Sequence, residues 1–514
     1  MSFNLTEQPW IPVVSKDFQL KEVSLIELFE TWNVYKEIRG DNPPTTLAIY
    51  RLLLAILHRA YDGPRNEEHW EKIDQDNGEK AIVYLQNHRD CFDFLHPERP
   101  FMQDPILPID KAVPVYAIHT MSTSMVFSHE HESSGYRISL PETARLLVRL
   151  QGVDITSLRA FYVGQTQGNR SAVNTPSINT INVWIQCTTL KDSLLYNLVR
   201  YDPSADEPSP VTGQDLPSWE TSYAGKPIQT VPKGYISYLT FPWRRLRVFV
   251  ENEVVSQIAI TMGNSLKTSA KQWECFIPYQ DDKPLRFSPG RQLWRDADSL
   301  ILFADKNQSS IKSCRPRTLD WLSQLEGLAD DVVHLQVFGL GADKAKPLAW
   351  VMERLSVPRQ YIFHKNKGLS DALKRAIDSA ETHQNVFRSF RGSPYGVLAE
   401  VLKYGDAGKL AKTLDGESRY WATLDRAFPE LLFDLPNDHE TGADGIQVYG
   451  NKRLVTWTNT IQKAATDAFT ESIASIRNYE ARAASLRSLS YHLAVLRGDI
   501  DPKAKRTSKG KKAA

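Results

Sequence analysis

The sequence predicts an α+β protein with a large mixed N-terminal α/β domain followed by a C-terminal four-helix bundle. Short apolar runs separated by turns fill most of the first part of the chain, which is typical of strands mixed with helices. From about residue 367 onward, apolar residues recur three, four or seven positions apart over long segments, as in antiparallel helices. We therefore expect a domain over residues 1–365, a helical bundle over 366–500 and a basic, disordered tail over 501–514.

The composition is that of a globular chain. Its 514 residues exceed what one ordinary hydrophobic core needs, and 41% hydrophobic with 24% charged residues argues against wholesale disorder. No run approaches about 18 uninterrupted apolar residues, so no membrane span is expected. The first residues have neither a basic segment nor a long apolar one, which predicts no signal peptide and a cytoplasmic protein.

Charge and cysteines restrict the chemistry. The formal net charge of +1 shows that the chain as a whole is not a polycation, which leaves room for local basic patches. The four cysteines stand far apart without a C-x-x-C pair, so we predict free thiols in a reducing compartment, no zinc site and no cofactor. They are Cys91, Cys187, Cys275 and Cys314.

Two N-terminal helices have clear boundaries. Thr45–Tyr61 is apolar on most sides and should be buried, and Asp62-Gly63-Pro64 ends it. A second helix follows Ser139, which forms the pattern of a capping box with Glu142, and ends at Gly152. The expected strands of this domain include Tyr238–Phe241, Arg245–Val250 and Val332–Phe338.

The C-terminal domain should consist of helices joined by short loops, which favours a bundle. The expected helical segments are Leu369–Phe390, Pro394–Leu414, Tyr420–Leu432 and two segments across Leu454–Leu496.

The stretch Asp331–Leu355 predicts a strand, an exposed tip and a helix. Gly339 and Gly341 break the apolar run of the strand, and helix-like spacing resumes after Pro347. The tip between them, A-D-K-A-K, carries two lysines. On its own it fits a polar surface loop, and the alternative is a tip that rigid neighbours aim at a ligand.

The familiar enzyme motifs are absent from the sequence: there is no P-loop, no dinucleotide-binding glycine motif, no H-E-x-x-H and no G-x-S-x-G. His129-Glu130-His131-Glu132 is the one cluster of histidines and acids. Two histidines two positions apart suit a metal, but no third ligand is visible, so a solvated loop is the preferred interpretation. A binding role is favoured over catalysis.

Three stretches suit contact with nucleic acid. In G-Q-T-Q-G-N-R, Gly164–Arg170, glycines let the backbone approach a phosphate or a base edge, and the polar side chains supply donors, but a plain surface turn fits the same letters equally well. Trp243–Arg247 alternates an aromatic residue with cations, which either a phosphate-facing surface or a strand with one wet face predicts. The segment Tyr279–Phe287 is equally ambiguous.

Several segments, in order along the chain, resemble the large subunit (CasA family) of the type I-E CRISPR surveillance complex, Cascade. They are N-L-T-E-Q-P-W-I-P-V, V-S-L-I-E-L-F, H-P-E-R-P-F-M-Q with a small insertion relative to the family's H-P-F-M-Q, S-L-P-E-T-A-R-L-L-V-R-L-Q and W-V-M-E-R-L. The resemblance implies a non-catalytic subunit of an antiviral complex. Such a subunit recognises the protospacer-adjacent motif (PAM) in duplex DNA, helps separate the strands for guide pairing and R-loop formation, and helps recruit a helicase–nuclease.

The resemblance also implies which residues contact DNA. The tip that inserts beneath the motif, a glutamine followed by alanine in the family, corresponds to Lys344-Ala345, between Asp343 and Lys346. A lysine donates but does not accept as an amide does, so the motif preference is expected to differ. The family's glycine loop corresponds to Gly164, Gly168, Asn169 and Arg170, and its groove-contacting lysine to Lys283.

A mobile loop that orders on target binding corresponds to Met121–Tyr136, with Val126, Phe127 and His129. The implied partners are the other Cascade subunits with guide RNA, double-stranded target DNA and the helicase–nuclease. One alternative is a structural scaffold whose bundle docks on neighbouring subunits and whose DNA contact is incidental. A second is a metal-dependent nuclease using His129 and His131, which is disfavoured because the carboxylates of a two-metal site are not found.

Overall fold

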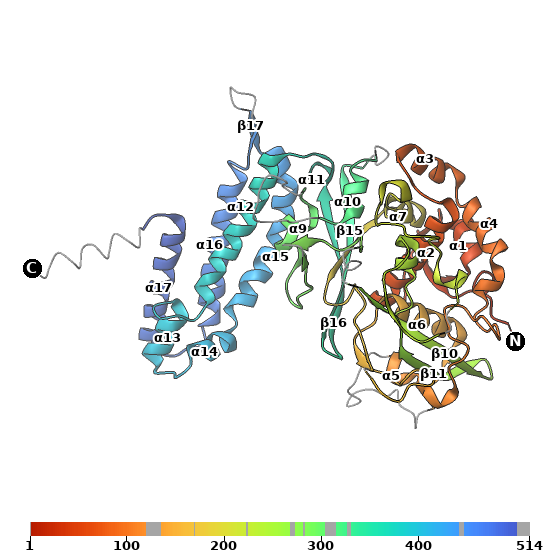
Figure 1. Cartoon of the computed structure of the whole chain (residues 1–514). Helices are drawn as coiled ribbons and strands as arrows, with labels where there is room; N and C mark the ends of the chain where they lie inside the picture. The colour runs from red at the N-terminus through yellow and green to blue at the C-terminus, as the bar shows by residue number, and fades with distance from the viewer. Residues whose placement is uncertain are drawn as a thin grey trace, which may run out of the picture. The chain divides into compact units, whose positions relative to one another are not determined.

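The computed structural model (Figure 1) describes residues 2–119, 135–168, 170–222, 225–267, 273–280, 283–303, 315–325, 330–441 and 447–500. The chain divides into two compact units. The first comprises residues 1–291 and 299–363, and the second comprises residues 292–298 and 364–514. The first unit mixes helices with strands and the second is mainly helical, so the predicted combination of α and β structure is confirmed.

Helix α2, Pro43–Tyr61, forms the centre of the first unit (Figure 1). The Asn42 side chain caps it by accepting a hydrogen bond from the Thr45 N–H at 3.0 Å, and prolines occupy the first positions, where no N–H is needed. The helix is buried along most of its length and packs against α4 (Glu79–Asn87), α6 (Leu140–Gly152) and α8 (Tyr235–Leu239). The predicted buried helix is confirmed, and it ends at Asp62 in the left-handed conformation.

Helix α6 begins with the predicted capping box. The Ser139 hydroxyl accepts from the Glu142 N–H, and the Glu142 carboxylate accepts from the Ser139 N–H at 2.8 Å. Each side chain thus satisfies a backbone donor that the first helical turn leaves unpaired. The remaining helices of this unit are α1 (Leu25–Thr31), α3 (Glu67–Asp76), α5 (Tyr116–His119), α7 (Leu190–Tyr196), α10 (Arg317–Leu322) and α11 (Arg359–Phe363).

Three sheets carry most strands of the first unit. Their strand orders are β2-β1-β3, β10-β11-β4 and β16-β15-β8. The bounds are β1 Ile11–Ser15, β2 Leu20–Val23, β3 Tyr35–Ile38, β4 Ala112–Pro114, β8 Ile181–Gln186, β10 Arg244–Glu251, β11 Val254–Met262, β15 Val332–Asp343 and β16 Lys346–Pro358. The two predicted strands Arg245–Val250 and Val332–Phe338 are therefore confirmed.

The prediction of a strand over Tyr238–Phe241 is wrong. These residues lie in and just after α8, which follows Gly234 and packs against α2. Four of its five side chains are buried. A short segment that is apolar on all sides has no periodicity to distinguish a strand from a helix, and packing decides between them.

The prediction of a helix after Pro347 is also wrong, because β15 and β16 form one long antiparallel hairpin. Leu340 pairs with Trp350, and Leu335 pairs with Leu355. Along Lys346–Val351 the side chains alternate between exposed and half-buried, as a strand requires. On its other side β15 pairs with β8 from Gln186 to Ile181, so β16 is the edge strand of this sheet.

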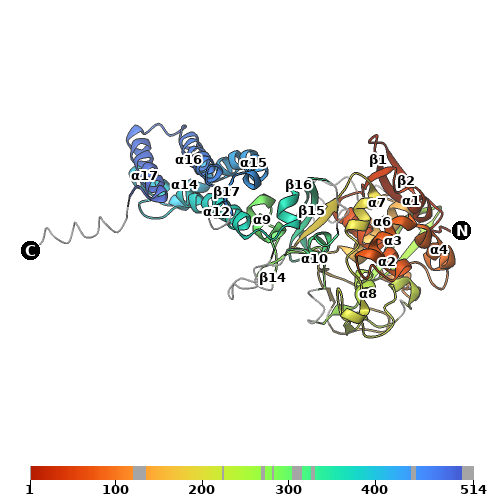
Figure 2. The same ribbon diagram turned by 90° about the horizontal axis from the view of Figure 1, so that it is seen from above.

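The second unit contains six α-helices within residues 364–441 and 447–500. Helix α16 lies beside α12 and α15, and α17 lies beside α13 (Figures 1 and 2). The predicted helix Pro394–Leu414 is interrupted by Lys403 in the left-handed conformation, and Asp406 caps a new helix after the break. That these helices form a four-helix bundle stays a prediction. The bounds are α12 Lys367–His383, α13 Pro394–Leu402, α14 Ala407–Leu414, α15 Gly416–Asp434, α16 Arg453–Ser472 and α17 Tyr479–Arg497.

The core of the second unit includes a segment that comes from earlier in the sequence. The Trp294 ring stacks on Phe428 with centroids 4.4 Å apart, and its N–H donates to the Asp425 carboxylate at 2.7 Å. The Arg295 guanidinium lies 3.5 Å from the centre of the Trp421 ring. These contacts explain why residues 292–298 group with the helices. Among the described helices of the chain, none has the length and apolar character that crossing a membrane requires.

Candidate nucleic-acid interface

The glycine loop connects two short paired strands, β6 (Ser157–Leu158) and β7 (Ser171–Ala172). Gly164 and Gly168 have φ angles of +74° and +111°, a region that residues with a side chain rarely adopt. A Cβ atom added to either would meet no heavy atom within 4 Å. The glycines are therefore required by the backbone conformation and not by packing, and the space beside both of them is open.

On the C-terminal side of the loop, the Arg170 side chain remains exposed. Its guanidinium lies 5.2 Å from the centre of the Phe161 ring, and the Arg170 carbonyl accepts from the Arg159 N–H at 3.1 Å. This contact orients the cation beside the glycines without burying it. Asn169, the remaining predicted contact of the loop, lies outside the described residues.

Arg244 holds the base of this loop. Its side chain is fully buried, and its guanidinium donates to the Asp154 carboxylate at 2.7 Å. It also donates to the carbonyl oxygens of Ile155, just before β6, and of Val173, just after β7, at 3.1 and 2.9 Å. One buried side chain thus ties together the two chain segments that enter and leave the glycine loop.

Asp154 carries the negative charge that stabilises the buried Arg244. We call Arg244 with its bonds to Asp154, Ile155 and Val173 the clamp. Burial raises the pKa of the Asp154 carboxyl, and the positive charges of Arg244, Arg159 and Arg149 lower it. The lowering is larger than the raising, so the pKa lies below its ordinary value. The carboxylate is therefore ionised at neutral pH. Its backbone N–H also donates to the Thr175 hydroxyl at 3.1 Å, and its C=O accepts from the Thr175 N–H at 3.1 Å, which fixes the segment that follows β7.

The interpretation of Trp243–Arg247 as a surface facing phosphates is wrong. Arg244 is the buried clamp, and Arg245 is also buried, with a hydrogen bond from its guanidinium to the Asn264 side chain at 3.3 Å. Arg247, which is half-buried, donates to the Leu107 carbonyl at 3.0 Å and lies over the Phe249 ring. The alternative, a strand with one wet face, is wrong for Arg244 and Arg245 as well. Arg244 is tolerated inside the protein because the Asp154 carboxylate and backbone carbonyls accept its hydrogen bonds.

The predicted lysine tip is the turn of the β15–β16 hairpin. Asp343 pairs with Lys346, and Lys344 and Ala345 form the turn between them. Asp343, Lys344 and Lys346 are exposed, and Ala345 is half-buried. Lys344 has a φ of +55°, an unfavourable conformation for a residue with a long side chain. Such strain persists when the surrounding structure holds it, and it is common where a site needs a fixed geometry.

Lys283 lies on a second, shorter hairpin, formed by β13 (Tyr279–Gln280) and β14 (Lys283–Pro284), and it is exposed. This hairpin is anchored on β15 through Phe287. The Phe287 ring covers Gly339, where an added Cβ would come within 2.4 Å of the ring, and Gly341, where the distance would be 3.2 Å. The glycines that separate the strand from the tip thus make room for an aromatic ring.

Asn179 contacts both the tip hairpin and the segment after the Lys283 hairpin. It follows β7 by seven residues, and its side-chain amide makes two hydrogen bonds with the backbone of Ala342, at 3.0 and 2.6 Å. Its own N–H donates to the Leu340 carbonyl at 2.8 Å, and its carbonyl accepts from the Phe287 N–H at 3.2 Å. The supports of the tip and of the Lys283 hairpin therefore meet at one residue.

Four of the predicted site residues cannot be placed by these contacts. Val126, Phe127 and His129 of the predicted mobile loop lie outside the described residues, as does Asn169. His131 of the alternative metal site lies there too. Over the described part of the chain, no three His, Cys, Asp or Glu side chains gather as metal ligands would.

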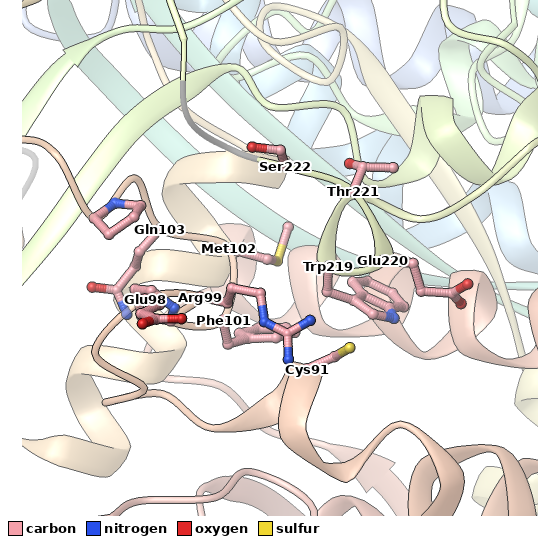
Figure 3. A pocket seen from close by; sticks show the side chains of 12 residues that line it. Cys91, Glu98, Arg99, Phe101, Met102, Gln103, Trp219, Glu220, Thr221 and Ser222 are labelled. Carbon is pink, nitrogen blue, oxygen red and sulfur yellow. The ribbon is translucent and has the colours of Figure 1, made fainter.

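A separate pocket of about 250 Å³ lies in the first unit (Figure 3). Side chains from residues 91–105 line one side and those from Trp219 to Ser222 line the other (Figure 3). Arg59 donates to both Glu220 oxygens, and the pKa of that carboxyl is lowered, because this pairing and a bond from Tyr84 outweigh its burial. Burial raises the pKa of the Cys91 thiol, which makes it a poor nucleophile.

Comparisons with known proteins agree with the fold. A family model described as CRISPR-associated protein Cse1 matches residues 4–468. A Thermus thermophilus protein named CRISPR-associated protein CasA/Cse1 is 28% identical over 467 residues, which cover 84% of this chain and 87% of that protein. The T. thermophilus CasA (Cse1) structure is similar with a TM-score of 0.75 and 23% identity over 97% of this chain and 99% of that chain.

Two further solved structures show the same fold. Thermobifida fusca Cse1 has a TM-score of 0.75 and 22% identity, covering 96% of this chain and 98% of its own. A chain of a structure described as a CRISPR RNA-guided surveillance complex has a TM-score of 0.76 and 20% identity, covering 96% of this chain and 99% of its own.

Proposed function

The chain belongs to the CRISPR-associated Cse1 (CasA) family, and from this premise we propose that it is a non-catalytic subunit of a type I-E RNA-guided antiviral complex. In this role it recognises the PAM of duplex DNA, helps separate the strands so that the guide RNA can pair, and helps recruit a helicase–nuclease. The match of the family model over residues 4–468 supports the placement, as does the likeness to a chain of a surveillance complex.

The observation that carries the proposal is the shared support of two exposed groups. The hairpin below the tip at Lys344 and the segment that follows the Lys283 hairpin are both hydrogen-bonded to Asn179, which comes seven residues after the strand that ends the glycine loop. A reader of duplex DNA needs cations and open backbone at fixed spacing, because phosphate contacts set the register and groove contacts read the bases. Rigid elements behind exposed groups meet that need.

The chemistry of the tip favours tolerant recognition. Lys344 donates hydrogen bonds and accepts none, and the minor groove presents acceptors on every base pair. The protein should therefore accept several motif sequences instead of demanding one. Splitting the first base-pair step costs about 1–2 kcal/mol of stacking, which a wedged tip and backbone contacts are able to supply.

The second unit supplies the contacts with other subunits. Its helices fall within the C-terminal domain of residues 366–500 that the sequence predicts as a four-helix bundle after an N-terminal domain of residues 1–365, and residues 292–298 pack with them. In the segment before α13, Phe390 is 47% exposed between the exposed Arg388 and Arg391, and Tyr404 is 42% exposed before α14. Exposed aromatic rings beside arginines are the residue types that protein interfaces favour and that also contact nucleic acid.

A charge-reversal experiment separates this function from that of a scaffold. Lys344→Glu with Lys283→Glu should leave assembly with the other subunits and guide RNA intact, while the affinity of the complex for duplex DNA falls. The matched control is Lys16→Glu, an exposed lysine of the same unit outside the proposed site. A complex that keeps its full duplex affinity with both site lysines reversed would instead support the scaffold role.

A further inference from the structure

Asn179 uses all four of its polar groups. Its Nδ2 donates to the Ala342 carbonyl at 3.0 Å, and its Oδ1 accepts from the Ala342 N–H at 2.6 Å. Its backbone N–H bonds to Leu340 and its carbonyl to Phe287. It adopts a left-handed φ of +60°, which asparagine tolerates better than most residues. An amide that satisfies one backbone donor and one backbone acceptor of the same residue mimics a neighbouring β-strand.

Asn179 makes these bonds where the pairing of β15 with its neighbouring strand β8 has ended. The pairing of β15 with β8 ends at Gly339 and Ile181. On the other side, the pairing with β16 continues to Asp343 and Lys346, with a shift of register between Gly341 and Ala342. Without another partner, the N–H and the carbonyl of Ala342 would have no strand to bond to on the side that β8 has left.

We propose that Asn179 is the residue that positions the tip: its side chain takes the place of the missing strand partners at Ala342. This inference rests on the proposed function of the tip as a wedge. A tip that is already ordered loses little conformational freedom on entering DNA, so more of its contact energy is available to separate the first base pair.

Replacement by glycine tests the side chain alone. Asn179→Gly keeps the left-handed backbone available and removes both bonds to Ala342, whereas alanine would add backbone strain. Asn179→Asp is the second variant, since it keeps the shape and an acceptor for the Ala342 N–H but places an oxygen against the Ala342 carbonyl. The matched control is Asn252→Gly, an exposed left-handed asparagine in the turn between β10 and β11.

The first measurement is hydrogen–deuterium exchange of the full-length chain, read on peptides that contain Ala342. Exchange there should be about 10-fold faster in Asn179→Gly, the effect of losing one to two net hydrogen bonds, less accelerated in Asn179→Asp, which keeps the acceptor for the Ala342 N–H, and unchanged in Asn252→Gly. Unchanged exchange in the Asn179 variants would overturn the inference.

The second measurement is the affinity of the assembled complex for a closed duplex and for a target whose first base pairs are already open. The variants should lose about 10-fold on the closed duplex and keep their affinity for the opened one, as expected if ordering the tip contributes to strand separation. Equal losses on both targets would show general damage and overturn the inference, as would no loss on either while Lys344→Ala weakens closed-duplex binding.

The same assay distinguishes this inference from the proposed function. If Lys344→Ala leaves closed-duplex binding unchanged, the wedge function is wrong. Exchange at Ala342 then decides by itself whether Asn179 positions the tip.

Discussion

The ring of Phe287 lies where any side chain at Gly339 would have to be. A Cβ atom at Gly339 would come within 2.4 Å of the Phe287 Cδ2, closer than atoms of folded proteins approach. Phe287 follows the Lys283 hairpin, and Gly339 is on β15, four residues before its end at Asp343. The contact therefore fixes one proposed DNA-contacting hairpin on the other.

Gly339→Ala should destabilise the protein by about 1–3 kcal/mol, because the Phe287 ring has to move to admit the methyl group. Gly341→Ala is the graded control, since its Cβ would lie 3.2 Å from the same ring, a distance that a small shift relieves. Urea unfolding followed by tryptophan fluorescence measures both free energies of unfolding. Equal values for the two variants would contradict the role of the Gly339 contact.

Arg244→Met should lower the free energy of unfolding by about 3 kcal/mol, since it leaves the buried Asp154 carboxylate without its main partner. Arg247→Met, which removes a half-buried arginine of the same strand, should cost about 1 kcal/mol or less. Combining Arg244→Met with Asp154→Asn should recover part of the loss. A single Arg244→Met variant as stable as Arg247→Met would show that the clamp contributes little.

The buried His58 predicts a loss of stability in mild acid. Burial lowers the pKa of its ring from 6.5 to about 4, although its Nδ1–H donates to the Gly63 carbonyl at 2.8 Å. Between these values the unfolded chain binds a proton that the folded chain does not. The contribution of the neutral His58 ring to the free energy of unfolding is complete above pH 6.5. It falls by about 1.4 kcal/mol per pH unit as the pH decreases toward 4.

His58→Asn, which keeps a side-chain donor near the Gly63 carbonyl, should therefore show a shallower decline of unfolding free energy between pH 6.5 and 4 than the unchanged protein. The measurement is urea unfolding at several pH values. Around pH 8 the ring is neutral in both the folded and the unfolded chain. The difference in unfolding free energy between the two proteins should therefore not change with pH there. Parallel curves through the acid range would exclude His58 as the titrating group.

Lys283→Ala should reduce the salt dependence of duplex binding. A lysine that contacts a phosphate releases about one counterion, so the slope of log affinity against log salt concentration should fall by about 1. Titrations of the assembled complex at several salt concentrations give the slope, with Lys16→Ala as the exposed control. An unchanged slope for Lys283→Ala would place this lysine outside the DNA contact.

The sequence predicts the helices well because their signals are local. Ser139 and Glu142 stand three residues apart and form the capping box that the pattern indicates. The second strand of the long hairpin is different. Leu348, Trp350, Val351 and Leu355 satisfy helical spacing as well as they fit a strand, and pairing with residues of β15, such as Leu340, decides the outcome.

The contacts that hold the candidate site could not be predicted from the sequence, because each joins residues that are far apart in the chain. Arg244 finds its partner Asp154 90 residues away, and Asn179 finds Ala342 163 residues away. A buried and a phosphate-facing arginine are written with the same letter, so W-R-R-L-R does not reveal which it contains. Asn179 leaves one faint signal, because asparagine tolerates the left-handed backbone. The exposed lysine tip, in contrast, is predictable from the glycines and lysines that follow a regular strand, whereas Lys283 is implied only by the family resemblance.

The wedge function of the hairpin tip is tested most directly by Lys344→Ala in the assembled complex. Affinity is measured for a matched closed duplex and for the same target with its first base pairs already open. Because opening the first step costs about 1–2 kcal/mol, we predict a loss of about 10-fold on the closed duplex and nearly unchanged binding to the opened target. Binding that is unaffected on both targets, or weakened equally on both, would contradict a tip that separates the strands.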